Sequence, residues 1–163
     1  MGAKSSIVRA DGEGEKLWFY GGGIHTWKAT SQETDGSLSL FEDTLVRGKC
    51  TPLHHHPHHD EVVYVIEGEI LIHREDGDRR VGPGSTLVTP RGVPHAFVVV
   101  SETARLLFLN TPGEGEAFYR RASVPVDVSG KDGPVDFQKI AEAAMETGAT
   151  VILGPPPFAR AQP

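Results

Sequence analysis

Short apolar runs, many of them alternating with polar residues, follow one another from about residue 16 to residue 110. The run 37–46 alternates Leu38 and Leu40 with polar neighbours and then shifts phase, and the stretch 61–75 reads as two strands with a break between them. Alternation with a period of two is typical of half-buried strands, and turn-forming residues separate the runs. Further strands are predicted at 17–20, 24–29, 79–90, 94–100 and 104–110. The pattern therefore predicts an all-β sandwich or barrel.

The pattern changes after residue 112. Residues 113–134 read mostly as connection, whereas 135–148 carries apolar residues at helical spacing, with Gly148 placed as a C-cap. The apolar stripe consists of Phe137, Ile140, Ala141, Ala144 and Met145. We interpret it as the face that packs on the outside of the barrel. The chain is thus predicted to have three parts, which are a flexible N-terminal arm (1–15), a β-barrel domain (16–112) and a C-terminal extension (113–163) with one helix packing on the barrel.

Composition and charge narrow the class of protein. The chain has 163 residues and a formal net charge of −6, enough for one domain with a core of its own. The acidic balance argues against a nucleic-acid partner, because no basic patch is available to neutralise phosphates. No apolar run approaches a membrane span, and no apolar segment follows the first basic residues as in a signal peptide. A single cysteine, Cys50, excludes an internal disulfide, so we predict a cytoplasmic protein.

Five of the six positions 54–59 are histidines, namely His54, His55, His56, His58 and His59. Their spacing to other residues divides them. Five residues separate Gly48 from His54, one separates His54 from His56, four separate His56 from Glu61, and six separate Glu61 from Gly68. The stretch reads G-x5-H-x-H-x4-E-x6-G.

A second spaced pattern begins at Gly84 and reads G-x5-P-x-G-x2-H, with Pro90, Gly92 and His95 at its fixed positions. Taken in order, the two patterns resemble the first and second motifs of the cupin superfamily. The second motif usually ends in a structural Asn, where this chain has Val99. The resemblance implies a double-stranded β-helix (jelly-roll) barrel with a C-terminal helical extension. It also implies that one divalent metal ion is bound by His54, His56, Glu61 and His95.

Strand geometry gives the same four residues a physical rationale. Side chains at i and i+2 point to the same face of a strand, so His54 and His56 enter the barrel while His55 points outward. Glu61 opens the next strand, and His95 lies on a later one. Three imidazoles and one carboxylate suit Fe, Mn, Co, Ni, Cu or Zn, and the sequence does not decide among these metals.

The histidine cluster has alternatives to a built metal site. An internal run broken by proline is unlike a purification tag, and a metal-scavenging surface loop explains neither Glu61 nor His95 at matched spacing. A cupin that binds no metal is the serious alternative. The register that pairs His56 with His58 fits the spacing less well, so His58 and His59 are expected to face solvent at the barrel mouth. The remaining residues of interest are His25 and His73, expected to be surface or satisfied polar residues, and Cys50, expected to be a small buried residue and not a ligand.

The flanks suggest an activity. The aromatic and glycine-rich segment 18–48 and the segment 110–156, which leads through a helix to Gly-Pro-Pro, resemble those of quercetin 2,3-dioxygenase-like small cupins. The resemblance implies dioxygenation of an aromatic or enolic small molecule, with O2 as co-substrate and Glu61 as general base. The residues proposed to line an apolar pocket are Phe41, Val63, Val65, Phe97, Val99 and Phe108, with Tyr20 and Trp27 nearer its mouth. Each of these is more often plain core than pocket wall.

Two other functions stay open. One is a metal-dependent isomerase, cyclase or lyase acting on a small enolisable substrate with the same four residues. The other is a non-catalytic cupin that binds a small molecule. A homodimer is also predicted, because small cupins commonly pair through their sheets or N-terminal strands.

Overall fold

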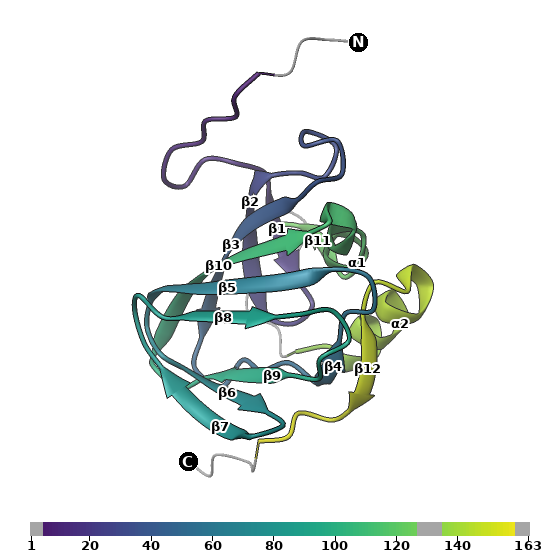
Figure 1. Cartoon of the computed structure of the whole chain (residues 1–163). Helices are drawn as coiled ribbons and strands as arrows, with labels where there is room; N and C mark the ends of the chain where they lie inside the picture. Colours follow the sequence, from purple (N-terminus) through teal and green to yellow (C-terminus); the bar gives the residue numbers. More distant parts are fainter. Residues whose placement is uncertain (1–4, 127–134, 159–163) are drawn as a thin grey trace.

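The computed structural model describes residues 5–126 and 135–158, and strands dominate both ranges (Figure 1). The strands up to the end of the barrel are β1 (Lys16–Phe19), β2 (Gly23–Ala29), β3 (Ser39–Val46), β4 (Leu53–His55), β5 (Asp60–Glu67), β6 (Ile70–Arg74), β7 (Gly77–Val81), β8 (Thr86–Thr89), β9 (Ala96–Val99) and β10 (Thr103–Thr111). Each predicted strand run is found. The predicted run 79–90 contains parts of two strands, β7 and β8, because the turn around Gly84 separates them.

The strands form three antiparallel sheets that close around one core. The largest has the order β11-β1-β2-β3-β10-β5-β8, in which β11 is Ser123–Pro125. The second is β7-β6-β9, and the third pairs β12 (Val151–Gly154) with β4. Figure 1 shows β5 and β8 of the largest sheet above β9, β6 and β7 of the second sheet. This arrangement confirms the predicted all-β fold of double-stranded β-helix type.

Burial along β3 follows a strict period of two. The inward side chains are Ser39, Phe41, Asp43 and Leu45, and the residues between them are half-buried or exposed. The prediction that grouped Leu38 with Leu40 and then shifted phase was wrong about this face. There is no shift of register between β3 and β10. Because Ser39 and Asp43 are polar, the continuous alternation of buried and exposed positions along β3 does not show in the hydrophobic pattern.

A glycine turn joins β5 to β6. Gly68 has φ of 80°, and a Cβ added to it would lie 2.2 Å from the carbonyl oxygen of Thr103. Only glycine fits this backbone conformation at this distance from a neighbouring chain segment. The turn returns the chain from the large sheet to the small one, and so closes one end of the barrel.

The C-terminal extension contains η1 (Gly113–Gly115), α1 (Glu116–Arg121), β11 (Ser123–Pro125), α2 (Phe137–Thr147) and β12 (Val151–Gly154). The predicted helix is α2, which is capped by the Asp136 side chain at its start and by Gly148 at its end. The second helix, α1, was not predicted, because six residues are too few to show a periodic stripe. The predicted stripe is also wrong at two positions, since Met145 is 86% and Phe137 43% exposed.

The extension is built into the barrel. β12 pairs with β4, so that Ile152 lies opposite His54 in the register. Figure 1 shows α1 and α2 together at the same side of the barrel as β4 and β12. The packing of the extension therefore bears directly on the region of the histidines.

The N-terminal segment 5–15 has no regular secondary structure but makes specific contacts. Arg9 binds Glu33, and Arg105 Nη1 lies 3.0 Å from Asp11 Oδ1. The flexibility predicted for 1–15 stays a prediction, and residues 1–4 lie outside the described part. Among the described residues there is no helix of the length and apolarity needed to cross a bilayer.

Candidate metal centre

Three buried imidazoles gather where β4 meets β9. The backbones of His54 and His95 form a two-way bridge, with the His54 amide donating to His95 O at 3.1 Å and the His95 amide donating to His54 O at 2.9 Å. His56 follows on the same inward face, two residues after His54. One ring nitrogen from each of His54, His56 and His95 lies within 4.8 Å of those of the other two. The strand alternation predicted from the sequence is what brings them together.

The Nδ1 atom of each ring is held by the chain. His54 Nδ1 lies 2.8 Å from Pro52 O, and His95 Nδ1 lies 3.1 Å from Val93 O. His56 Nδ1 lies 3.2 Å from the hydroxyl of Thr150, a residue of the C-terminal extension. Fixing Nδ1 in this way orients the ring and leaves Nε2 to a ligand, as in metal sites generally.

Glu61 completes the group from β5. Its Oε1 lies 3.3 Å from His95 Nε2 and its Oε2 lies 3.4 Å from His56 Nε2. The side chain is 3% exposed. Tyr119, on α1, donates its hydroxyl to Glu61 Oε2 at 2.9 Å. Glu61 thus faces two imidazoles on one side and a phenol on the other.

The electrostatics follow from burial and these contacts. Burial would raise the pKa of Glu61, but the nearby imidazoles of His56 and His95 outweigh this effect, and the pKa falls well below its usual value. Burial would lower the pKa of His95, but the hydrogen bond to Glu61 raises it. Burial and the neighbouring imidazoles lower the pKa of His54 well below its usual value. Burial, together with the charge of Glu61, raises the pKa of Tyr119.

The donor set fits a transition-metal ion. In the described part of the chain, the buried His56 Nε2 has no hydrogen-bond partner, and such an orphaned nitrogen is what a metal ligand leaves when no metal is present. Three imidazole nitrogens and one carboxylate suit a first-row divalent ion. The His54, His56 and His95 group could hold that ion, and Glu61 contacts two of its three rings.

His59 departs from its predicted position. It is 1% exposed, and its ring centroid lies 4.4 Å from that of His56. A Cβ on Gly115 would lie 2.7 Å from His59 Nε2, so the ring fits into space that only glycine leaves. The expectation that His59 faces solvent was wrong, because the chain turns inward again before β5. His58 is exposed, as expected.

A cavity of about 50 Å³ lies beside the imidazoles, with His54 and Glu61 on its wall. Its wall also includes Phe97 and Phe108 of the six predicted pocket residues, whereas Phe41, Val63, Val65 and Val99 lie in the buried core. Trp27 is 1% exposed and belongs to that core, not to a mouth. This volume accommodates a few water molecules and is small for a ligand pocket.

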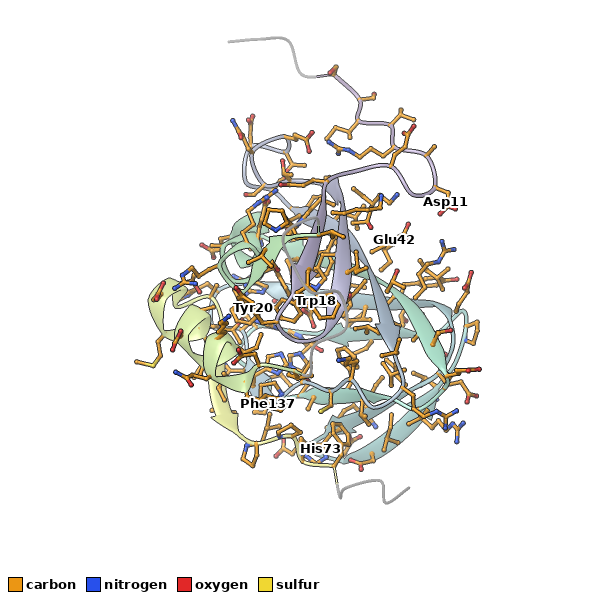
Figure 2. The ribbon with its side chains drawn as sticks, turned by 180° about the vertical axis from the view of Figure 1, so that it is seen from behind. Asp11, Trp18, Tyr20, Glu42, His73 and Phe137 are labelled. Atoms are coloured by element: carbon orange, nitrogen blue, oxygen red, sulfur yellow. The ribbon has the colours of Figure 1, made fainter. Side chains whose placement is uncertain are left out.

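The C-terminal extension forms part of the wall of this cavity. Phe137 and Ile140 of α2 and Ile152 of β12 contribute to its wall. Tyr20 lies beside the start of α2, where its carbonyl accepts from the Asp136 amide at 2.9 Å and its ring lies 4.3 Å from Lys139 Nζ. Figure 2 shows Tyr20 and Phe137 on this side of the molecule. Phe137, Ile140 and Ile152 therefore narrow the cavity on this side.

Sequence reasoning missed Tyr119, Asp43 and the burial of His25. Tyr119 lies in a short segment without periodic pattern, and nothing in the sequence links it to Glu61. Asp43 is 4% exposed and lines the cavity. His25, expected to be a surface or satisfied residue, is 0% exposed, and its Nε2 lies 3.4 Å from Asp43 Oδ2. Cys50, expected to be buried, is only half-buried and also lies on the cavity wall.

The fold and the buried histidine group together are those of a cupin with a candidate metal centre. Residues 42–110 match the family model of the cupin domain. The chain therefore carries a cupin domain, as its two spaced motifs predicted.

Relatives of named activity are distant. The chain is 26% identical over 120 residues to quercetin 2,3-dioxygenase of Bacillus subtilis (strain 168). The aligned region covers 74% of this chain and 35% of the relative. The match thus spans about a third of that protein's length.

Solved structures agree on the fold. The polyketide cyclase RemF from Streptomyces resistomycificus is 28% identical, with a TM-score of 0.50 over 64% of this chain and 70% of its own. KdgF from Halomonas sp. is 25% identical, with a TM-score of 0.51 over 56% of this chain and 79% of its own. An RmlC-like cupin from Shewanella frigidimarina, 21% identical with a TM-score of 0.56 over 68% of this chain and 95% of its own, shows the fold alone.

Proposed function

We propose that the chain is a metal-dependent cupin enzyme that dioxygenates a flavonol or a related enolic aromatic molecule. The observation that carries the metal dependence is the buried set of three imidazoles with Nδ1 atoms held by the chain and with Glu61 between two of them. The dioxygenase activity is supported by the likeness to a quercetin 2,3-dioxygenase. Substrate identity, the oxidative reaction and ligation by Glu61 are parts of the proposal.

The protein residues have distinct roles in it. A bound metal ion would supply a Lewis acid that lowers the pKa of an enol or phenol and open positions for substrate and O2. His54, His56 and His95 would hold the ion. Glu61 would accept the proton of the substrate hydroxyl, since its carboxylate lies beside the site and is kept ionised by its neighbours. Tyr119 holds that carboxylate in place by its 2.9 Å hydrogen bond.

The cavity sets a condition on this reaction. A flavonol needs a pocket of a few hundred Å³, whereas this cavity measures about 50 Å³. Binding would therefore require α2 and β12 to move outward, which removes Phe137, Ile140 and Ile152 from the wall. The apolar lining left behind, with Phe97 and Phe108, suits an aromatic ring.

The experiment begins with elemental analysis of protein purified without added metal. Oxygen uptake and the absorbance of quercetin are then followed after metal removal and restoration of Fe, Mn, Co or Ni, each tested separately. We expect uptake with at least one metal and its loss in Glu61→Gln. An unchanged quercetin spectrum with all four metals would remove the flavonol form of the proposal.

A non-oxidative reaction is the second candidate, and one observation favours it. The polyketide cyclase RemF is similar to this chain in sequence and fold, and the Tyr119–Glu61 pair offers an acid and a base within 2.9 Å of each other. Such a pair can move a proton on an enolisable substrate without O2. Solvent deuterium exchange into an aromatic 1,3-diketone under argon, lost in Glu61→Gln, would support this reaction.

A further inference from the structure

A buried aspartate–histidine pair lies beside the cavity, apart from the three imidazoles, and Asp43 of this pair lines the cavity wall. Asp43 occupies an inward position of β3 between Phe41 and Leu45 and is 4% exposed. His25 lies directly opposite on β2 and is 0% exposed. The distance from His25 Nε2 to Asp43 Oδ2 is 3.4 Å. An ionisable pair in a row of core positions is costly to bury and calls for a reason.

The pair is rigidly held but incompletely bonded. The His25 ring stacks on Phe19 with ring centroids 4.5 Å apart, and its centroid lies 5.3 Å from that of Tyr119. Within the described residues, neither His25 nitrogen nor Asp43 Oδ1 has a hydrogen-bond partner. A Cβ on Gly23 would lie 2.1 Å from Asp43 Oδ1, so a glycine makes room for the carboxylate. The pair therefore keeps unused capacity for hydrogen bonds beside a cavity.

Asp43 and Glu61 mark two separate places on the wall of the same cavity. Asp43 lies opposite Leu106 of β10, which lies opposite Val65 of β5, four residues along that strand from Glu61. With a strand spacing of about 4.8 Å and a rise of about 3.3 Å per residue, the two Cα atoms are about 16 Å apart along the sheet. Both side chains point into the barrel, so a molecule that contacts both carboxyl groups needs two polar groups on different parts of it.

We propose that Asp43, oriented by His25, accepts a hydrogen bond from a second hydroxyl group of the substrate. The site then selects aromatic molecules that carry one hydroxyl at the metal and another within reach of Asp43. This inference rests on the proposed function for the position of the first hydroxyl. Asp43 is on this account a specificity-determining residue, and His25 is a positioning residue that acts through it.

Two probe ligands test the proposal. 3-Hydroxyflavone carries only the hydroxyl that would meet the metal, and quercetin adds hydroxyls on both ring systems. Their dissociation constants are measured by absorbance titration under argon, with protein loaded with the metal that the elemental analysis identifies. We expect the parent to favour quercetin about tenfold, the effect of one hydrogen bond to a carboxylate. In Asp43→Asn the preference should fall to within about twofold, with the affinity for 3-hydroxyflavone unchanged.

Two further variants keep the test decisive. Glu42→Gln removes the neighbouring carboxylate, which points out of the barrel on the same strand, and should keep the tenfold preference. His25→Gln leaves the Asp43 carboxylate but not the ring that holds it, and should lose part of the preference. Any of three results would overturn the proposal. The preference for quercetin could survive in Asp43→Asn, Asp43→Asn could lose affinity equally for both probes, or the parent could fail to discriminate between them. Oxygen uptake is read separately, so binding with the expected preference but without turnover would count against the dioxygenase and not against Asp43.

Discussion

Replacing Tyr119 by phenylalanine removes a single oxygen atom, the hydroxyl that donates to Glu61 at 2.9 Å. The ring keeps its contacts, since its centroid lies 4.7 Å from that of Phe41 and 5.2 Å from that of Phe118. The variant therefore leaves the core packing intact. It leaves a carboxylate that is 3% exposed with two imidazole contacts of 3.3 and 3.4 Å.

The expected loss follows from that geometry. A hydrogen bond to a charged group contributes about 1.5–3 kcal/mol, so the free energy of unfolding of the metal-free chain should fall by about 2 kcal/mol. In urea this moves the midpoint by about 1 M. Partners that orient a metal ligand also tune the metal, and their loss typically weakens metal affinity about 10- to 100-fold. Both effects are predicted for Tyr119→Phe.

The assay uses urea unfolding followed by tryptophan fluorescence, together with a competition titration for metal affinity. Tyr64→Phe is the matched control, because Tyr64 lies on the same strand as Glu61 but is 41% exposed. A change there should stay within about 0.5 kcal/mol. If Tyr119→Phe behaves like Tyr64→Phe in both measurements, then Tyr119 does not position Glu61, and its role in the proposed mechanism must be withdrawn.

Three further predictions follow from the same region. Zn²⁺ or Co²⁺ should raise the melting temperature of the metal-free parent but not of His95→Ala, measured by calorimetry, and an equal rise in both would contradict a site at this place. Burial and the neighbouring His56 charge lower the pKa of His59 to about 4, while its unfolded value is about 6.5. Between these two values the unfolded chain binds a proton that the folded chain does not bind. The free energy of unfolding should therefore fall by at most about 3 kcal/mol as pH drops from about 6.5 to 4. That part of the slope in a pH series of urea midpoints should vanish in His59→Gln and persist in His58→Gln. Gly115→Ala places a Cβ 2.7 Å from His59 Nε2 and should lower the free energy of unfolding in urea by about 1–3 kcal/mol. The control Gly154→Ala, whose Cβ would have nothing within 4 Å, should cost less. Equal losses in the two variants would show that the His59 ring moves aside without cost.

Much of the fold was predictable because strands show a period of two in the sequence and glycine marks the turns between them. Side chains at i and i+2 share a face, so the spacing of His54 and His56 already placed both inside a barrel. The conformation of Gly68 (φ 80°) is the physical reason for one fixed glycine of the first motif. Within the extension, α2 was visible from its caps, while α1 was not, because a helix of six residues has no periodicity to read.

Apart from Tyr119, the parts of the site that the sequence did not reveal are polar residues at inward positions. Periodicity assigns inward positions by hydrophobicity, so Ser39 and Asp43 made the inward face of β3 look like the outer one. The spacing of the first motif placed His59 outside, although its ring packs 4.4 Å from that of His56. Burying such groups costs free energy unless another group meets them. A position where the hydrophobic pattern fails inside an otherwise regular strand is therefore where a ligand contact should be sought, and Asp43 is that position in this chain.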